Sequence, residues 1–253
     1  MKVLALNSSP RCKDQSKSEL LLNSLVEGMR STNADLEVVH LRTKKINYCI
    51  GCLTCWTKTP GICVHKDDMS RELFPKFLES DLAVFATPLY YFGVNAQLKT
   101  FMERTLPAFE PFVIERNGKA SHPLRKRHPL IVALSVAGFP EDSVFDQMSS
   151  HLRYIYNGAL IAEIYRPAAE TMVQPGFEKV YDDILDAVKQ AGMEIIQNFK
   201  VSDDTMKRIK QPVIDLETMC ELSNMYWRIC IDEGVNLKEA LERNIVMKGL
   251  EGQ

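Results

Sequence analysis

KVLALNSSPR, residues 2–11, opens the chain and decides which fold we expect. Residues 2–6 are apolar after Lys2 and end abruptly at polar residues, a pattern typical of a buried strand in a parallel sheet. Residues 18–29 then place leucines on one face at helical spacing, with Ser16 or Ser18 as the candidate N-cap. The chain therefore begins with a predicted strand, a polar turn and a predicted helix.

The same alternation of strands and helices continues over most of the chain. Further buried strands are predicted at residues 36–41, 81–86, 130–135 and 159–165. Helices are predicted at residues 69–79, 93–104, 142–156 and 180–199. Strands that alternate with helices form βαβ units, and right-handed crossovers then give a parallel sheet with helices on both faces. We predict an α/β fold, a flavodoxin-like doubly wound five-stranded parallel sheet with a C-terminal helical extension.

The alternation stops near residue 202, where two helical patterns follow each other at residues 213–233 and 236–247. We therefore predict a first domain at residues 1–201, which includes a cysteine-rich loop at residues 47–68. The second unit, residues 202–253, is predicted to be a helical extension and not another α/β domain.

Composition narrows the classes of partner. The 253 residues have a formal net charge of -2, which gives no basic field to attract nucleic acid or anionic lipid. No stretch is apolar for long enough to cross a membrane, and the first residues turn polar too early for a signal peptide. We expect a cytoplasmic protein without nucleic-acid or membrane partners. In that compartment, seven cysteines are more typical of ligands or reactive thiols than of disulfides.

The turn at residues 7–18 has the composition of a phosphate site. It contains no glycine, so the dinucleotide fingerprint G-x-G-x-x-G is absent. In doubly wound sheets ligands bind beyond the carboxyl ends of the strands, and a helix N-terminus there favours a phosphate. We expect Ser9, Ser16 and Ser18 to donate hydrogen bonds to the phosphate oxygens, and Arg11 to neutralise their charge. The alternative is a polar loop with an ordinary serine N-cap.

Two further turns are expected at the same edge of the sheet. The first, TPLYYFG at residues 87–93, offers apolar and aromatic groups that suit a flat isoalloxazine ring: Pro88, Leu89, Tyr90, Phe92 and Gly93. The second, SVAGF at residues 135–139, offers Ser135 and Gly138, where a backbone could approach a flat ligand closely. The alternative for the aromatic turn is that its rings simply pack the loop into the core.

The segments NSSPR, SKSELL and ATPLYYFGVNAQLKTFMER resemble those of the NAD(P)H-dependent FMN reductases and iron-sulfur flavoproteins, a group of flavodoxin-like oxidoreductases. In architecture the resemblance covers residues 1–199. It implies that the four residues named in the first turn surround the phosphate of FMN, and that residues 88–90 and 92 border its ring. It also implies a homodimer or homotetramer, in which part of the extension contacts a second subunit. The alternative is that the extension packs on its own domain.

A compact cysteine motif, C-x2-C-x2-C-x7-C, is formed by Cys49, Cys52, Cys55 and Cys63. Three thiols at successive intervals of three residues can surround one small centre, and thiolates are the usual ligands of iron–sulfur clusters. The iron-sulfur flavoproteins that the chain resembles hold a 4Fe-4S cluster in a motif of this type. Free or redox-active thiols are one alternative, and zinc is another, although zinc prefers two separated pairs of cysteines.

These features predict an FMN-dependent oxidoreductase in which the chemistry takes place on the flavin, without a catalytic side chain. With a 4Fe-4S cluster, the protein would pass electrons between a one-electron donor, such as a ferredoxin-like protein, and the FMN. Without a cluster, it would be an NAD(P)H-dependent reductase of quinones, free flavin or another small-molecule electron acceptor. A third possibility is a redox carrier or regulatory flavin-binding protein that has no substrate of its own.

Overall fold

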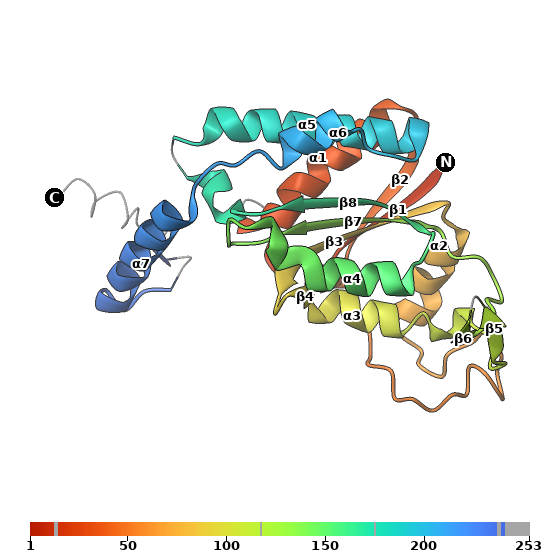
Figure 1. Cartoon of the computed structure of the whole chain (residues 1–253). Coiled ribbons are helices and arrows are strands. Elements are labelled where there is room, and N and C mark those ends of the chain that lie inside the picture. The colour runs from red at the N-terminus through yellow and green to blue at the C-terminus, as the bar shows by residue number, and fades with distance from the viewer. Residues whose placement is uncertain (13–14, 117, 175, 237–238, 241–253) are drawn as a thin grey trace.

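A computed structural model describes residues 1–12, 15–116, 118–174, 176–236 and 239–240. Its central sheet has the strand order β2-β1-β3-β7-β8, and all pairs along this path are parallel (Figure 1). The five parallel strands are β1 (Lys2–Asn7), β2 (Asp35–His40), β3 (Leu82–Tyr90), β7 (Leu130–Val136) and β8 (Leu160–Arg166). Counted in chain order this is 2-1-3-4-5, the flavodoxin-like order, so the predicted fold class is confirmed.

Helices cover both faces of the sheet (Figure 1). One face is covered by α1 (Lys17–Ser31) and α5 (Glu178–Asn198), and the other by α2 (Phe74–Glu79), α3 (Ala96–Glu103) and α4 (Asp146–Ile155). Two glycines bring α1 and α5 close together. A Cβ atom on Gly28 would lie 1.9 Å from the carbonyl oxygen of Lys189, and one on Gly192 would lie 2.2 Å from that of Leu25. A larger residue at either position would therefore force the two helices apart.

The helix predicted at residues 69–79 is divided into a π-helical turn, Met69–Leu73, and α2. Pro75 has no amide proton to donate, and the helix type changes next to it. The helix predicted at residues 93–104 begins later, because Gly93–Val94 forms the short strand β4, antiparallel to β3. Short 3-10 helices also occur, namely η2 (Leu41–Thr43), η4 (Leu106–Ala108), η5 (Asp142–Phe145) and η6 (Ala169–Val173).

A β-hairpin and a short helix were also not predicted. Strands β5 (Ile114–Arg116) and β6 (Lys119–Ser121) form an antiparallel hairpin whose connecting sequence, Asn-Gly, is a strong hairpin signal. Helix α6 (Asp203–Ile209) is capped by Ser202, whose hydroxyl accepts a hydrogen bond from the amide of Thr205.

Beyond α6 the chain continues into α7 (Leu216–Asp232), which lies to one side of the sheet and its covering helices (Figure 1). Buried Arg166 of β8 donates to the carbonyl oxygens of Ile209 (2.9 Å) and Gln211 (2.7 Å), and so ties the start of this extension to the sheet. Most of the helix predicted at residues 236–247 lies outside the described residues. Among the helices described, none has the length and apolar character needed to cross a membrane.

Candidate functional site

The turn after β1 is bonded directly to the end of β3. The amide of Ser8 donates to the carbonyl oxygen of Ala86 at 2.8 Å, and the Ser8 hydroxyl donates to the same oxygen at 3.0 Å. The amide of Ser9 donates to Oδ1 of Asn7 at 2.9 Å. These groups are buried, so their hydrogen bonds fix the path of the turn. The first and third strands therefore bring their turns together, as the sequence predicted.

Asn95, which the sequence analysis did not single out, joins three parts of this edge. Its Nδ2 donates to the carbonyl oxygen of Ser8 at 2.6 Å, and its amide donates to the hydroxyl of Thr87 at 3.2 Å. Its Oδ1 accepts from the amide of Leu98 at 3.2 Å and so caps α3. Asparagine just before a helical pattern is a recognisable N-cap signal, but the contact with Ser8 has no counterpart in the local sequence.

The three serines predicted around the phosphate are all buried at the first turn. Ser16 is the N-cap of α1, because its hydroxyl accepts a hydrogen bond from the amide of Glu19 at 3.2 Å. This capping role was the alternative considered for the turn. The N-terminus of α1 thus lies at the carboxyl edge of the sheet, where a helix favours an anion. Direct contacts of Ser9, Ser16 and Ser18 with a phosphate stay a prediction.

Two cations lie beside the same turn. Arg11 is partly exposed and its Nη1 lies 3.1 Å from Oε1 of Glu170 in η6. Lys17, in contrast, is only 5% exposed, and its Nζ lies 3.4 Å from the other oxygen of Glu170. A buried ammonium at a helix N-terminus is costly unless it is paired with an anion. Lys17 therefore joins Arg11 as a candidate counter-charge, and the sequence analysis missed it.

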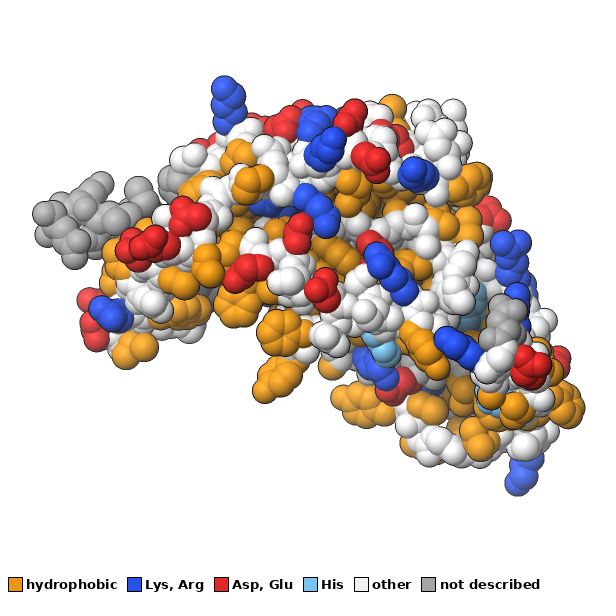
Figure 2. All heavy atoms as spheres, viewed as in Figure 1, with side chains coloured by type: hydrophobic (Ala, Val, Ile, Leu, Met, Phe, Trp, Pro, Cys, Tyr) orange, Lys and Arg blue, Asp and Glu red, His pale blue; other side chains and the backbone are white. Residues whose placement is uncertain are grey.

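The β3–β4 turn presents aromatic rings in an unusual backbone conformation. Tyr90 pairs with Gly93, and the two residues between them, Tyr91 and Phe92, have φ values of 52° and 59°. Two-residue hairpin turns of this kind favour Asn-Gly, because other side chains are strained at positive φ. Tyr91 is fully exposed, and hydrophobic side chains stand out from the surface between α3 and α7 (Figure 2). Strained, exposed rings are typical of a ligand site.

The rest of the predicted ring site is divided between strand and turn. Pro88 and Leu89 lie in β3, where Pro88 pairs with Val136 across the sheet. Ser135, expected where the predicted strand passes into the turn, lies within β7 opposite Thr87, because the strand continues to Val136. Its hydroxyl is buried and finds no hydrogen-bond partner among the described residues. Gly138 is exposed in the turn that follows.

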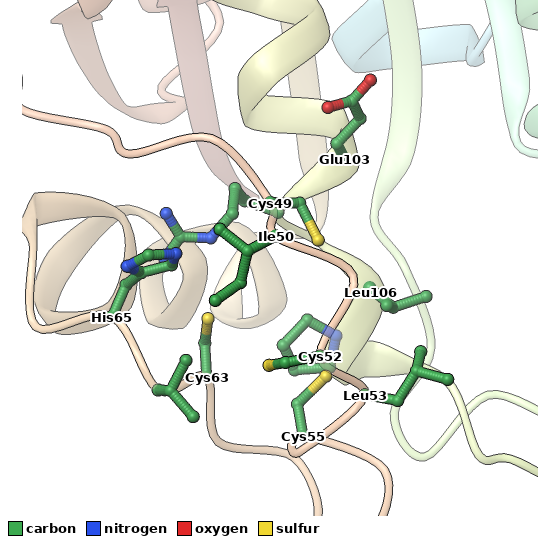
Figure 3. A pocket seen from close by; sticks show the side chains of 12 residues that line it. Cys49, Ile50, Cys52, Leu53, Cys55, Cys63, His65, Glu103 and Leu106 are labelled. Carbon is green, nitrogen blue, oxygen red and sulfur yellow. The ribbon is translucent and has the colours of Figure 1, made fainter.

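The four cysteines of the predicted metal site lie around one small cavity. Their sulfur atoms face a common region next to Ile50 and Leu106 (Figure 3). The cavity has a free volume of about 20 Å³. Within the part of the chain that the structure describes, no three or more His, Cys, Asp or Glu side chains are grouped as ligands of a metal ion. The metal site therefore stays a prediction, which the common orientation of the thiols supports.

The thiols differ in their electrostatic surroundings. Burial raises the pKa of Cys55, and so do the neighbouring charges of Cys63, Cys52 and Cys49. The pKa of Cys52 is lowered, mainly because it accepts a hydrogen bond from the side chain of Thr54. Four thiolates in one cavity repel each other, so a bound cation would favour their deprotonation.

A buried ion pair closes the base of the cysteine loop. Arg104, the C-cap of α3, donates from Nη1 to Oδ2 of Asp67 at 2.7 Å and from Nη2 to Oδ1 at 3.1 Å. Arg104 also donates to the carbonyl oxygen of Asn47 at 2.6 Å and to the hydroxyl of Ser70 at 3.0 Å. Asn47 precedes the first cysteine and Asp67 follows the last, so the pair holds both ends of the loop.

The ion pair also changes the titration of its carboxylate. Burial raises the pKa of Asp67, but hydrogen bonds from Arg104 and from the amides of Asn47 and Ser70 outweigh it and hold the pKa well below its ordinary range. The amide of Ser70 donates to Oδ1 of Asp67 at 3.1 Å, as expected for a carboxylate just before a helix, whereas the pairing of Asp67 with Arg104 has no sequence signal.

Helix α3 connects the two regions. Asn95 caps its first turn beside the phosphate turn, and Arg104 ends it beside the cysteines. At 1.5 Å per residue, the two ends are about 14 Å apart. A ligand at the edge of the sheet and a centre in the cysteine loop would thus be separated by one short helix.

Comparison with known proteins places these features in a family. The model of the NADPH-dependent FMN reductase family matches residues 1–170. An iron-sulfur flavoprotein of Archaeoglobus fulgidus is 41% identical over 107 residues, which cover 42% of this chain and 46% of that protein. An FMN-dependent NADH:quinone oxidoreductase of Exiguobacterium is 25% identical over 199 residues, 75% of this chain and 93% of that protein. The chain spans about half the length of the iron-sulfur flavoproteins that it matches.

A solved structure supports the fold. The FMN-dependent NADH-azoreductase of Bacillus anthracis, in complex with FMN, superimposes with a TM-score of 0.57 and 17% sequence identity. The superposition covers 77% of this chain and 99% of the azoreductase. At 17% sequence identity, the superposition shows a shared fold and not a shared function.

Proposed function

Because this chain belongs to the NADPH-dependent FMN reductase family, we propose that it is an FMN-dependent oxidoreductase whose cysteine loop holds a 4Fe-4S cluster. The observation that carries the proposal is the grouping of four thiols around one cavity, one helix away from the turn that suits a phosphate. In this protein the cluster would pass electrons between a one-electron donor and the flavin.

The residues at the sheet edge fit FMN. When bound, FMN would supply hydride and single-electron chemistry. The N-terminus of α1, with Ser9, Ser16 and Ser18, offers donors to its phosphate, while Arg11 and Lys17 offer positive charge. The buried, unpartnered hydroxyl of Ser135 lies at the same edge.

The aromatic turn fits the ring of the flavin. The backbone of this turn is strained, and its aromatic rings are exposed to solvent. The residues predicted to border the ring lie in or beside it, namely Pro88, Leu89, Tyr90, Phe92 and Gly93. Covering an isoalloxazine face would bury that aromatic surface and offset the strain. Gly138 belongs to the turn after β7, the next strand of the sheet.

The cysteine loop fits an iron–sulfur cluster better than a single metal ion. The residues Cys49, Cys52, Cys55 and Cys63 line one cavity, but no three ligands among the described residues are gathered for one metal ion, which needs its sulfur ligands at about 2.3 Å. A cluster takes one thiolate for each of four irons. A buried arginine beside the cavity would offset part of the negative charge of four thiolates.

The donor and acceptor follow from the same proposal. A ferredoxin-like protein would deliver single electrons at the cysteine loop, which exposes several of its side chains. NAD(P)H and a small-molecule acceptor would react at the flavin. These partners are inferred from the chemistry of the two centres.

The proposal is tested on protein purified without oxygen. We expect flavin bands superimposed on a broad iron–sulfur absorbance, with four irons and four acid-labile sulfides for each FMN. Replacing Cys63 by alanine should abolish the iron and leave the flavin, while replacing the exposed Cys220 should change neither. Full iron content in the Cys63→Ala variant would overturn the assignment of the loop. A colourless protein that FMN cannot reconstitute would overturn the whole proposal.

A second function, a cluster-free NAD(P)H-dependent FMN or quinone reductase, is favoured by one specific comparison. The match with the Exiguobacterium quinone oxidoreductase covers 93% of that protein and 75% of this chain. Protein without iron, whose flavin is bleached rapidly by NADH or NADPH, would support this function. Flavin that is reduced only by a reduced one-electron carrier would support the cluster protein.

We also propose that α7 mediates assembly into a homodimer or homotetramer. Four of its apolar side chains are exposed, namely Leu216, Leu222, Trp227 and Ile231. An amphipathic helix with exposed aromatic and aliphatic residues is typical of an interface. Sedimentation of the full chain should show an oligomer. The double variant Trp227→Glu with Ile231→Glu should sediment as a smaller assembly. An unchanged size would exclude α7 from the interface.

A further inference from the structure

Arg104 stands apart from the other arginines because it is buried beside the cysteine cavity. The residue is 2% exposed, and its side chain lines both the cysteine cavity and a neighbouring hollow of about 310 Å³. The hollow lies between the cysteine loop, α2 and Pro107. Three residues line both hollows, namely Cys63, Arg104 and Pro107.

Four hydrogen bonds of this guanidinium go to residues that flank the cysteines in the chain. Nη1 and Nη2 donate hydrogen bonds to Asp67, Asn47 and Ser70 at the base of the loop. The remaining nitrogen, Nε, is buried and has no hydrogen-bond partner of ordinary geometry among the described residues. A buried guanidinium N–H without a partner is costly, so it indicates a missing acceptor.

Cys63 is placed to be that acceptor. Burial lowers the pKa of Arg104, but Asp67 and the thiolate charge of Cys63 outweigh burial and raise it. Cys63 and Arg104 also line the same two hollows, so the Cys63 sulfur lies beside the guanidinium.

We propose that Arg104 is a positioning residue. Its Nε–H group donates a hydrogen bond to the Cys63 sulfur and raises the reduction potential of the cluster. This inference rests on the proposed function, because it requires the cluster to be present. Reduction adds negative charge to a centre that four thiolates already make negative. A fixed positive charge and a hydrogen bond to a ligand sulfur stabilise the reduced state, and both raise the potential.

A merely structural role predicts a different result. If Arg104 only closed the loop, its removal would lower stability or iron content without a defined change in potential. The electrostatic role predicts opposite shifts for the two members of the ion pair. Removing the negative charge of Asp67 leaves the positive charge of Arg104 unpaired, which should raise the potential. Removing both residues takes the cation away from Cys63, which should lower the potential.

The experiment is a redox titration of the full-length, iron-loaded protein, followed by the EPR signal of the reduced cluster. In Asp67→Asn, the midpoint potential should become less negative than in the wild type. In the double variant Arg104→Met with Asp67→Leu, which replaces the pair by apolar side chains, it should become more negative. Arg104→Lys keeps the charge and should stay closer to the wild type than the double variant.

The matched control is Arg71→Met, which removes an equal charge from an exposed site near the loop. Solvent screens the charge of Arg71, so the midpoint potential of the cluster in this variant should equal the wild-type value. Equal potentials in all loaded variants, or shifts of the same sign in Asp67→Asn and the double variant, would overturn the inference. If the double variant does not take up iron, the sign of the shift in Asp67→Asn decides. A wild-type protein without iron would instead refute the proposed function.

Discussion

The phosphate turn and the cysteine loop are both attached to α3, but they are held in different ways. The turn after β1 is short, and several separate hydrogen bonds between buried polar groups fix it to the sheet. The loop at residues 47–68 is long, contains no regular helix or strand, and exposes Tyr48, Ile50 and Ile62. One buried ion pair closes its base.

This difference indicates how each site obtains its shape. A turn fixed by several separate contacts can take its shape before its ligand binds, and losing one contact leaves the others in place. A loop that depends on one ion pair is sensitive to the loss of either partner, because the other charge is left buried. In such a loop, ligation by several thiolates would add cross-links that the folded chain itself does not provide.

The largest effect is expected at the ion pair. Asp67→Asn should lower the free energy of unfolding at pH 7 by about 3 kcal/mol, because Arg104 remains buried without its anion. The folded pKa of Asp67 is below its unfolded value of about 3.9, so its stabilisation exists above that pH and is lost as the pH falls. Urea denaturation at pH 7 and pH 3 should therefore show a difference between variant and wild type that shrinks in acid.

A matched carboxylate separates this effect from ordinary surface charge. Glu27 forms an exposed ion pair with Lys189, so Glu27→Gln should cost less than about 1 kcal/mol at either pH. Equal losses for the two variants would show that the loop does not depend on its ion pair.

The next effect concerns the ligand and not the fold. Arg11→Ala should weaken FMN binding by about 10- to 100-fold, because a charged hydrogen bond to a phosphate contributes roughly 1.5–3 kcal/mol. Riboflavin, which has no phosphate, should bind both proteins equally. Fluorescence titration measures both affinities, and Arg30→Ala at the other end of α1 serves as the control. A parallel loss of riboflavin affinity would place Arg11 away from the phosphate.

A smaller effect is expected where the two regions meet. Asn95→Ala removes the cap of α3 and the donor to Ser8, so unfolding should become easier by about 1–2 kcal/mol. FMN affinity should fall as well, because the turn loses one support. Asp215 caps α7 with the same kind of bond, and Asp215→Ala should lower stability by at most about 1 kcal/mol without changing FMN affinity. Thermal denaturation and flavin titration test both variants.

The sequence predicted the sheet well because buried parallel strands are short apolar runs that helices separate. It missed β4, since the two residues of this strand carry no periodic signal. The turns at the sheet edge could also be predicted, because the carboxyl ends of neighbouring parallel strands share one edge. Asn95 and Arg104 could not, because their partners Ser8 and Asp67 are 87 and 37 residues away in the chain.

The smallest effect tests whether the aromatic turn belongs with the well-fixed turn beside it. Tyr91→Asn with Phe92→Gly supplies residues that accept positive φ, so the free energy of unfolding should rise by about 1 kcal/mol. FMN affinity should fall, because the exposed rings are lost. Phe199 has a φ of 56° at the end of α5, so Phe199→Gly should stabilise the protein similarly without affecting FMN. If the double variant is stabilised and its flavin titration is unchanged, the strain at Tyr91 and Phe92 does not serve the flavin.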